Sequence, residues 1–117
     1  LIPLADGVLV MPLIGTIDTL RAQQVLTTLL DGVSSLRART VILDITGIPW
    51  VDTNIAGSLL QAERAVSLLG AEIVLTGISP RVAQTLVSMG ADLSQVTTRS
   101  TLQSGIAYAL SHQQRSR

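Results

Sequence analysis

Hydroxyl and carboxylate side chains gather in one short stretch of the chain, residues 44–57, which reads DITGIPWVDTNIAG. Thr53 precedes a helical pattern that starts at Ile55, and a helix start is the positive end of the helix dipole. A hydroxyl there is well placed to gain and lose a phosphate, because backbone N–H groups stabilise the anion. Threonine also caps many helices, and the pattern alone favours this plainer role for Thr53. Both roles stay open at this point.

Two carboxylates in the same stretch, Asp44 and Asp52, allow a different chemistry. They could act as a general acid and base or bind magnesium. Alternatively, Asp44 ends a strand and Asp52 caps a helix, and the local sequence offers no nucleophile or second cation ligand. We therefore expect structural roles for both, with a small enzyme that uses Asp44 and Asp52 as the alternative.

Further candidates lie around a second strand-to-helix turn. Ser79 and Pro80 are typical of a cap and a first helical residue. Thr85 falls on one helical stripe with Arg81, and by pattern it is a surface threonine. A phosphate on Thr85 could pair with the Arg81 guanidinium one turn earlier. Trp50, the only tryptophan, either plugs one end of the core or is an exposed anchor for a partner.

Composition excludes several kinds of chemistry. All 8 basic residues are arginine, and the lack of lysine excludes a Walker-type phosphate loop, a Schiff-base enzyme and a kinase with a catalytic lysine. There is no cysteine and only one histidine, which argues against disulfides, thiolate metal sites and a histidine triad. The formal net charge is +0, so no basic surplus indicates nucleic acid. We expect no metal, no cofactor and no nucleic-acid partner.

Strand-type and helix-type patterns alternate along the chain and predict an α/β fold. Two apolar runs around the Asp6-Gly7 turn predict an antiparallel hairpin, and strands joined by helices should run parallel. We therefore expect a mixed, mostly parallel sheet of about five strands packed against about four helices. The predicted elements, two strands and then alternating helices and strands, span residues 2–4, 8–11, 18–36, 40–43, 53–69, 72–76, 80–89, 93–97 and 100 onward.

Apolar periodicity also predicts which side chains face the sheet. The buried stripes of the four helices end with Leu36, Leu69, Val87 and Leu110. Ser58 falls on an outer face, and Ser100 with Gln103 predicts a capping box for the last helix. Pro12 cannot donate to a strand ladder, so it should sit at a strand end, a bulge or an edge.

The length of 117 residues predicts one domain with its own core. The chain begins with Leu1 and not Met, so we expect it to be the C-terminal part of a longer sensor protein. No apolar run reaches the roughly 18 residues of a membrane span, and no signal peptide is visible. We therefore expect a cytoplasmic protein without a membrane partner.

The run DITGIPWVDTNIAGSLLQAERAVSLLGAEIVLTGISPRVAQTLVSMGADLSQV resembles the STAS domain family. That family includes anti-anti-sigma factors and the C-terminal parts of anion transporters. The combination of DITGIP, VDT, LLGAEIVLTGI and AQTLV is similar to the C-terminal domain of RsbR-type stressosome co-antagonists. The similarity covers nearly the whole chain, so we expect a single STAS domain over residues 1–117.

This resemblance implies two regulatory phosphosites. RsbR-type proteins carry Thr at the position of Thr53, where direct anti-sigma antagonists usually carry Ser, and a second phosphorylated Thr that matches Thr85. It also implies a switch-type serine/threonine kinase that docks on the domain and phosphorylates it, and assembly with related STAS domains and further copies. We expect partner contacts from residues around both threonines, namely Trp50, Asp52, Asn54, Ser79 and Arg81. Ser79 departs from the larger polar residue that relatives often have, and we expect the usual N-terminal sensory domain to lie outside these 117 residues.

The function that the resemblance implies is a non-enzymatic module of the bacterial stress-response complex, which controls sigma-factor or related output. A stand-alone anti-anti-sigma factor that binds an anti-sigma kinase directly is the alternative within the family. A transporter's cytosolic STAS domain is a third option, which the AQT segment fits poorly. The prediction of a phosphosite needs an exposed hydroxyl at Thr53, so a buried Thr53 would contradict it.

Overall fold

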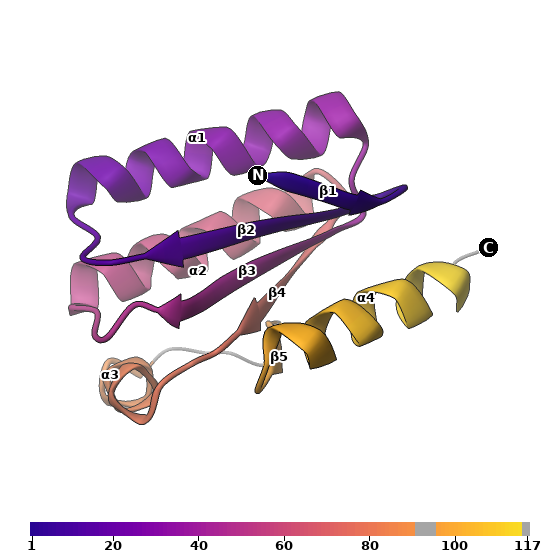
Figure 1. Ribbon diagram of the computed structural model, residues 1–117. Coiled ribbons are helices and arrows are strands. Elements are labelled where there is room, and N and C mark those ends of the chain that lie inside the picture. The colour runs from indigo at the N-terminus through magenta and orange to yellow at the C-terminus, as the bar shows by residue number, and fades with distance from the viewer. Residues whose placement is uncertain (91–95, 116–117) are drawn as a thin grey trace.

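The computed structural model describes residues 1–90 and 96–115, with side chains up to Ser111. Strands and helices follow one another in the predicted order (Figure 1). Their bounds are β1 (Ile2–Ala5), β2 (Val8–Ile14), α1 (Thr19–Leu36), β3 (Thr40–Gly47), α2 (Thr53–Leu68), β4 (Glu72–Thr76), α3 (Pro80–Ser88), β5 (Thr97–Arg99) and α4 (Leu102–Arg115). No helix among the described residues has the length and hydropathy needed to cross a membrane.

The strands form one sheet in the order β1-β2-β3-β4-β5. β1 pairs with β2 antiparallel, and the remaining neighbours pair parallel. The predicted hairpin and the mixed, mostly parallel sheet are therefore confirmed for the described residues. β2 runs on through Pro12, where its pairing with β3 shifts register before Ile14. This irregularity is the bulge that the missing N–H of a proline favours.

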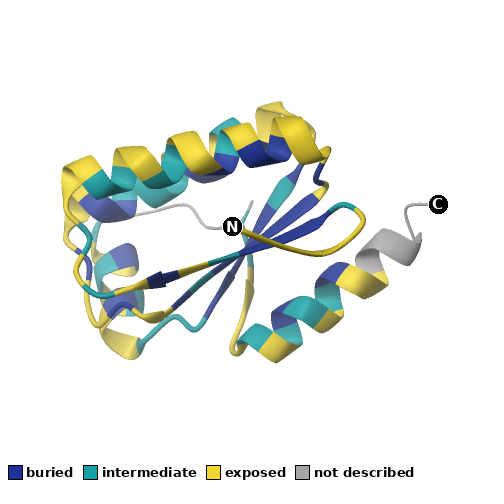
Figure 2. Ribbon diagram, turned by 45° about the horizontal axis from the view of Figure 1, so that its top comes forward, coloured by how far each residue is buried: buried dark blue, intermediate teal, exposed yellow. Residues whose placement is uncertain are grey.

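Helices cover both faces of the sheet (Figure 1). α1 and α2 lie together on one face, and α4 lies on the other, against β3, β4 and β5. Strand residues alternate between the two cores, because successive side chains point to opposite faces. Val41 and Leu43 pack with the α1 and α2 side, whereas Ile42 packs under α4. Figure 2 shows exposed residues along the outer side of α1 and buried or half-buried ones along its sheet side.

Four leucine or valine side chains that were predicted to end the buried stripes of the helices are exposed. Their exposed fractions lie between 40% and 76%, and they are Leu36, Leu69, Val87 and Leu110. Leu36 is the last residue of α1, and Leu69 is the C-cap of α2. An apolar stripe extends along a helix by periodicity, but the side chains at its end are buried only where the sheet reaches beneath them.

The last helix begins later than predicted, and the last strand can be compared with its prediction only from residue 96 onward. β5 starts at Thr97, and residues 93–95 of the predicted strand lie outside the described residues. The cap of α4 is Thr101, whose Oγ1 accepts from the Ser104 N–H at 3.1 Å. The Ser104 hydroxyl in turn accepts from the Thr101 N–H at 3.2 Å. The capping box is therefore Thr101 with Ser104, and the prediction of Ser100 with Gln103 is wrong by one residue.

Gly57 lies inside α2, and a Cβ added there would meet nothing within 4 Å. Replacing Gly57 with Ala should therefore raise the free energy of unfolding by about 0.5–1 kcal/mol, because glycine loses more backbone entropy on folding. Chemical denaturation followed by circular dichroism measures this change. A loss of stability would mean that this face of α2 is more crowded than the structure shows.

Candidate functional site

The segment between β3 and α2 turns sharply at the carboxyl end of the sheet. Ile48 and Val51 point inward and are buried, whereas Trp50 between them is 46% exposed. Of the two roles considered for this tryptophan, the exposed anchor agrees with its position, and the core plug does not. An exposed large aromatic ring is a typical contact for a partner protein.

Asp52 is the N-cap of α2. Its Oδ1 accepts a hydrogen bond from the Ile55 N–H at 2.8 Å. Thr53 is the first residue of the helix; it is exposed, and its hydroxyl makes no hydrogen bond to another described residue. The capping role considered for Thr53 therefore belongs to Asp52, and the hydroxyl of Thr53 faces solvent at the positive end of the helix dipole. Asn54 is also exposed.

The segment between β4 and α3 starts a second helix in a similar way. Ser79 is the N-cap, its Oγ accepts from the Val82 N–H at 3.2 Å, and Pro80 is the first helical residue. Arg81 is exposed, and its carbonyl oxygen accepts from the Thr85 hydroxyl at 3.2 Å. Thr85 was expected to be a surface residue and is half-buried. Arg81 and Thr85 are thus neighbours on one helical face, as predicted from their spacing.

The two helix starts lie at the same end of the sheet. β3 and β4 are parallel neighbours, so both segments leave from their carboxyl ends, and α2 packs against α3. Figure 1 shows the starts of α2 and α3 at one end of the molecule. The structure therefore gathers the residues named from the sequence into one region, although they come from two separate segments.

The side chain of Asp44 is half-buried near the end of β3. Its Oδ1 accepts from the Thr76 hydroxyl at 2.7 Å and from the Thr46 hydroxyl at 2.9 Å. Thr76 is the last residue of β4 and is buried. Asp44 was a candidate from the sequence, but its partners Thr46 and Thr76 were not. The signal that could have found them is a threonine beside an aspartate at the ends of adjacent parallel strands.

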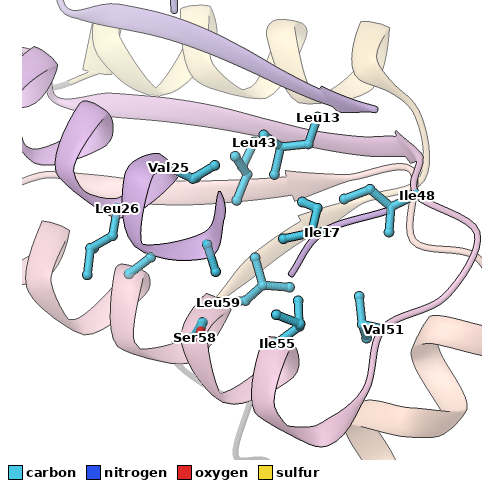
Figure 3. Close-up of a pocket in the computed structure, with 12 residues that line it drawn as sticks. Leu13, Ile17, Val25, Leu26, Leu43, Ile48, Val51, Ile55, Ser58 and Leu59 are labelled. Carbon is cyan, nitrogen blue, oxygen red and sulfur yellow. The ribbon is translucent and has the colours of Figure 1, made fainter. Parts of the chain in front are cut away.

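An apolar pocket of about 20 Å³ lies between α1, α2 and the sheet (Figure 3). Ile48, Val51 and Ile55 line the part nearest the β3–α2 turn, and Ser58 supplies the single polar side chain. Ser58 was predicted to point away from the core, and this is wrong. Its hydroxyl already donates to the Asn54 carbonyl at 3.1 Å, so the pocket offers water too few polar partners. Neither Asp44 nor Asp52 lines this pocket.

Metal ligands are also sparse at this end of the sheet. Among the residues that the structure describes, no three His, Cys, Asp or Glu side chains are grouped closely enough to hold a metal ion. The region presents a hydroxyl, two capped helix starts and an exposed tryptophan. Such an arrangement can be modified and recognised by another protein.

The family model for the STAS domain matches residues 2–105 of this chain. The chain belongs to the STAS domain family. This membership confirms the resemblance seen in the sequence. The STAS domain is 53% identical over 110 residues to the RsbT co-antagonist protein RsbRA of Bacillus subtilis (strain 168), a match that covers 94% of the STAS domain and 40% of RsbRA. It therefore spans less than half the length of this relative.

Solved structures resemble the STAS domain as well. A variant of RsbS from Moorella thermoacetica matches it with a TM-score of 0.82 and 31% identity, covering 94% of the STAS domain and 93% of that chain. A second match is a chain from the molecular architecture of the stressosome, which is described as a signal integration and transduction hub. Its TM-score is 0.78 and its identity 31%, and the match covers 94% of the STAS domain and 96% of that chain. The STAS fold predicted from the sequence is therefore confirmed.

Proposed function

We propose that this STAS domain is a non-enzymatic regulatory module of a stressosome-type complex, and that a switch-type serine/threonine kinase phosphorylates it on Thr53 and Thr85. The observation that carries the proposal is the exposed Thr53 hydroxyl at the start of α2, which the cap Asp52 leaves without a hydrogen-bond partner among the described residues. Identity to RsbRA supports the assignment to a regulatory complex.

The kinase is of the RsbT type, because relatives of this domain are named RsbT co-antagonist proteins. It contacts the region around both threonines, including Trp50, Asp52, Asn54, Ser79 and Arg81. The domain assembles with further copies and with related STAS domains, which agrees with its similarity to a chain of the stressosome. It works in the cytoplasm, without a nucleic-acid or membrane partner, and controls sigma-factor or related output.

Phosphorylation acts through charge and leaves the fold largely as it is. Each phosphate adds about −1.5 to −2 charges and three acceptor oxygens. At Thr53 the helix dipole stabilises this charge by about 0.3–1 kcal/mol, while the neighbouring Asp52 carboxylate opposes it. At Thr85 the phosphate can pair with the exposed Arg81 guanidinium on the same face of α3. The docking surface therefore changes its charge more than its shape.

An enzyme that uses Asp44 and Asp52 has little support. Such an enzyme needs a pocket that joins both carboxylates. Oδ1 of Asp44 accepts from two threonine hydroxyls, and Oδ1 of Asp52 accepts from the Ile55 N–H. Both carboxylates thus have the structural roles expected from the sequence.

Incubating the domain with an RsbT-type kinase and ATP, followed by peptide mass spectrometry, should place phosphate on Thr53 and on Thr85. Matched variants Thr53→Val and Thr85→Val keep the side-chain shape and lack the acceptor oxygen, so each should lose only its own phosphopeptide. Ser58, which lines the apolar pocket, and Thr28 of α1 serve as internal controls, because the proposal assigns a phosphate to neither of them. Phosphate found only at such positions would contradict the assignment.

A pull-down separates this function from that of a stand-alone anti-anti-sigma factor. A stressosome module should retain related STAS domains and the RsbT-type kinase. Retention of an anti-sigma factor alone would favour the stand-alone antagonist.

A further inference from the structure

The two segments that carry the proposed phosphosites are joined at the ends of β3 and β4. Asp44 and Thr76 are register partners across these strands. The Thr76 hydroxyl donates to Asp44 Oδ1 at 2.7 Å, and Thr76 is 0% exposed. Beyond this bond, one strand continues toward the cap of α2 and the other toward the cap of α3. A part-buried hydrogen bond thus links the two segments before they diverge.

Gly77 brings the same two segments into direct contact. A Cβ at Gly77 would lie 1.9 Å from Thr46 Oγ1 and 2.8 Å from the Thr46 backbone nitrogen. No side chain fits between the segments, and the φ angle of +75° at Gly77 is one that other residues rarely adopt. The separation between the segments is therefore set by backbone contact as well as by the Asp44–Thr76 hydrogen bond.

The Thr76 side chain is also held by α4, which covers the face of the sheet opposite α1 and α2. A Cβ on Gly105 of α4 would lie 2.5 Å from Thr76 Cγ2. The methyl group of Thr76 thus rests where α4 comes closest to the sheet, and its hydroxyl is directed to Asp44. Rotation of the side chain would break the hydrogen bond and bury an unpaired hydroxyl, which is costly.

We propose that Asp44 is a positioning residue: through its hydrogen bond to Thr76, it holds the start of α2, where Thr53 lies, and the segment that leads into α3, whose second turn carries Thr85, at a fixed separation, so that one docked kinase reaches both threonines. This inference rests on the proposed function, because it assigns a role to Asp44 in the same phosphorylation. Asp44 touches no phosphoacceptor in the structure, and it acts through the segments that carry them.

The variant Thr76→Val tests this role, since valine fills the same volume without the hydroxyl. We expect amide hydrogen exchange in residues 77–83 to become up to about tenfold faster, the factor that corresponds to about 1.4 kcal/mol for one lost hydrogen bond. We also expect the initial rate of phosphorylation at Thr85 to fall at least about threefold relative to that at Thr53. A general loss of stability would change both rates alike and leave their ratio unchanged.

Variants at Thr46 and Asp44 test whether the effect comes from the hydrogen bond between β3 and β4 or from packing around it. Thr46→Val removes a hydrogen bond to the same Asp44 oxygen but leaves the bond between the strands, so the ratio should stay as in the wild type. Asp44→Asn keeps an acceptor oxygen and should preserve the ratio, whereas Asp44→Ala should shift it as Thr76→Val does.

The outcomes distinguish the two proposals. If the wild-type chain is phosphorylated on both threonines and Thr76→Val leaves the ratio unchanged, the positioning role of Asp44 is overturned and the proposed function stands. If the kinase modifies neither threonine in the wild type, the proposed function fails, and the positioning role fails with it. If the ratio of the two phosphorylation rates shifts in Thr76→Val and stays unchanged in Asp44→Asn, both the proposed function and the positioning role are supported.

Discussion

A chain with Gly77→Ala should lose about 2–4 kcal/mol of unfolding free energy relative to the wild type. Two costs add at this position. Alanine at a φ angle of +75° is strained, and its Cβ would overlap Thr46, including the backbone nitrogen of that residue. A side chain alone could rotate away, but the backbone of β3 would have to shift. Urea denaturation followed by circular dichroism measures the loss.

Gly70 offers a matched control for this change. Gly70 follows the C-cap of α2 with a φ angle of +84°, and its N–H and that of Ala71 bond back to the last turn of the helix. A Cβ there would meet nothing within 4 Å, so Gly70→Ala should cost only the backbone strain, about 1 kcal/mol. Equal losses at Gly70 and Gly77 would show that the contact between the two segments contributes nothing to stability.

The domain phosphorylated on both Thr53 and Thr85 should bind the RsbT-type kinase at least about tenfold more weakly than the unmodified domain, a difference of about 1.4 kcal/mol. The physical reason is charge. Two phosphates add about −3 to −4 charges to a surface that already carries Asp52, and docking would have to desolvate them. Isothermal titration calorimetry on both forms gives the two dissociation constants.

The double variant Thr53→Val/Thr85→Val controls for the treatment itself. After incubation with kinase and ATP it should keep the affinity of the unmodified domain, because it has no acceptor at either position. Equal binding of the phosphorylated and unmodified wild-type domains would contradict release by phosphorylation, whatever the mass spectrum shows.

Local sequence signals predicted much of this fold correctly, because they describe interactions between residues close together in the chain. The Asp6-Gly7 turn, the aliphatic strands and the caps at Asp52 and Ser79 each depend on neighbours a few residues away. The parallel direction of the strands joined by helices was also predicted correctly, whereas their order within the sheet is known only from the structure. The same signals failed at Leu36 and Val87, since periodicity does not show where a helix leaves the sheet.

The sequence by itself determined the order of the elements, the starts of α2 and α3 and the hydroxyl candidates on them. Only the tertiary structure decided that Trp50 is exposed and that Asp44 accepts a hydrogen bond from Thr76. Those outcomes depend on which strands become neighbours and on how closely their ends approach. Residues 44 and 76 meet because β3 and β4 pair in register, and no pattern within either segment contains that information.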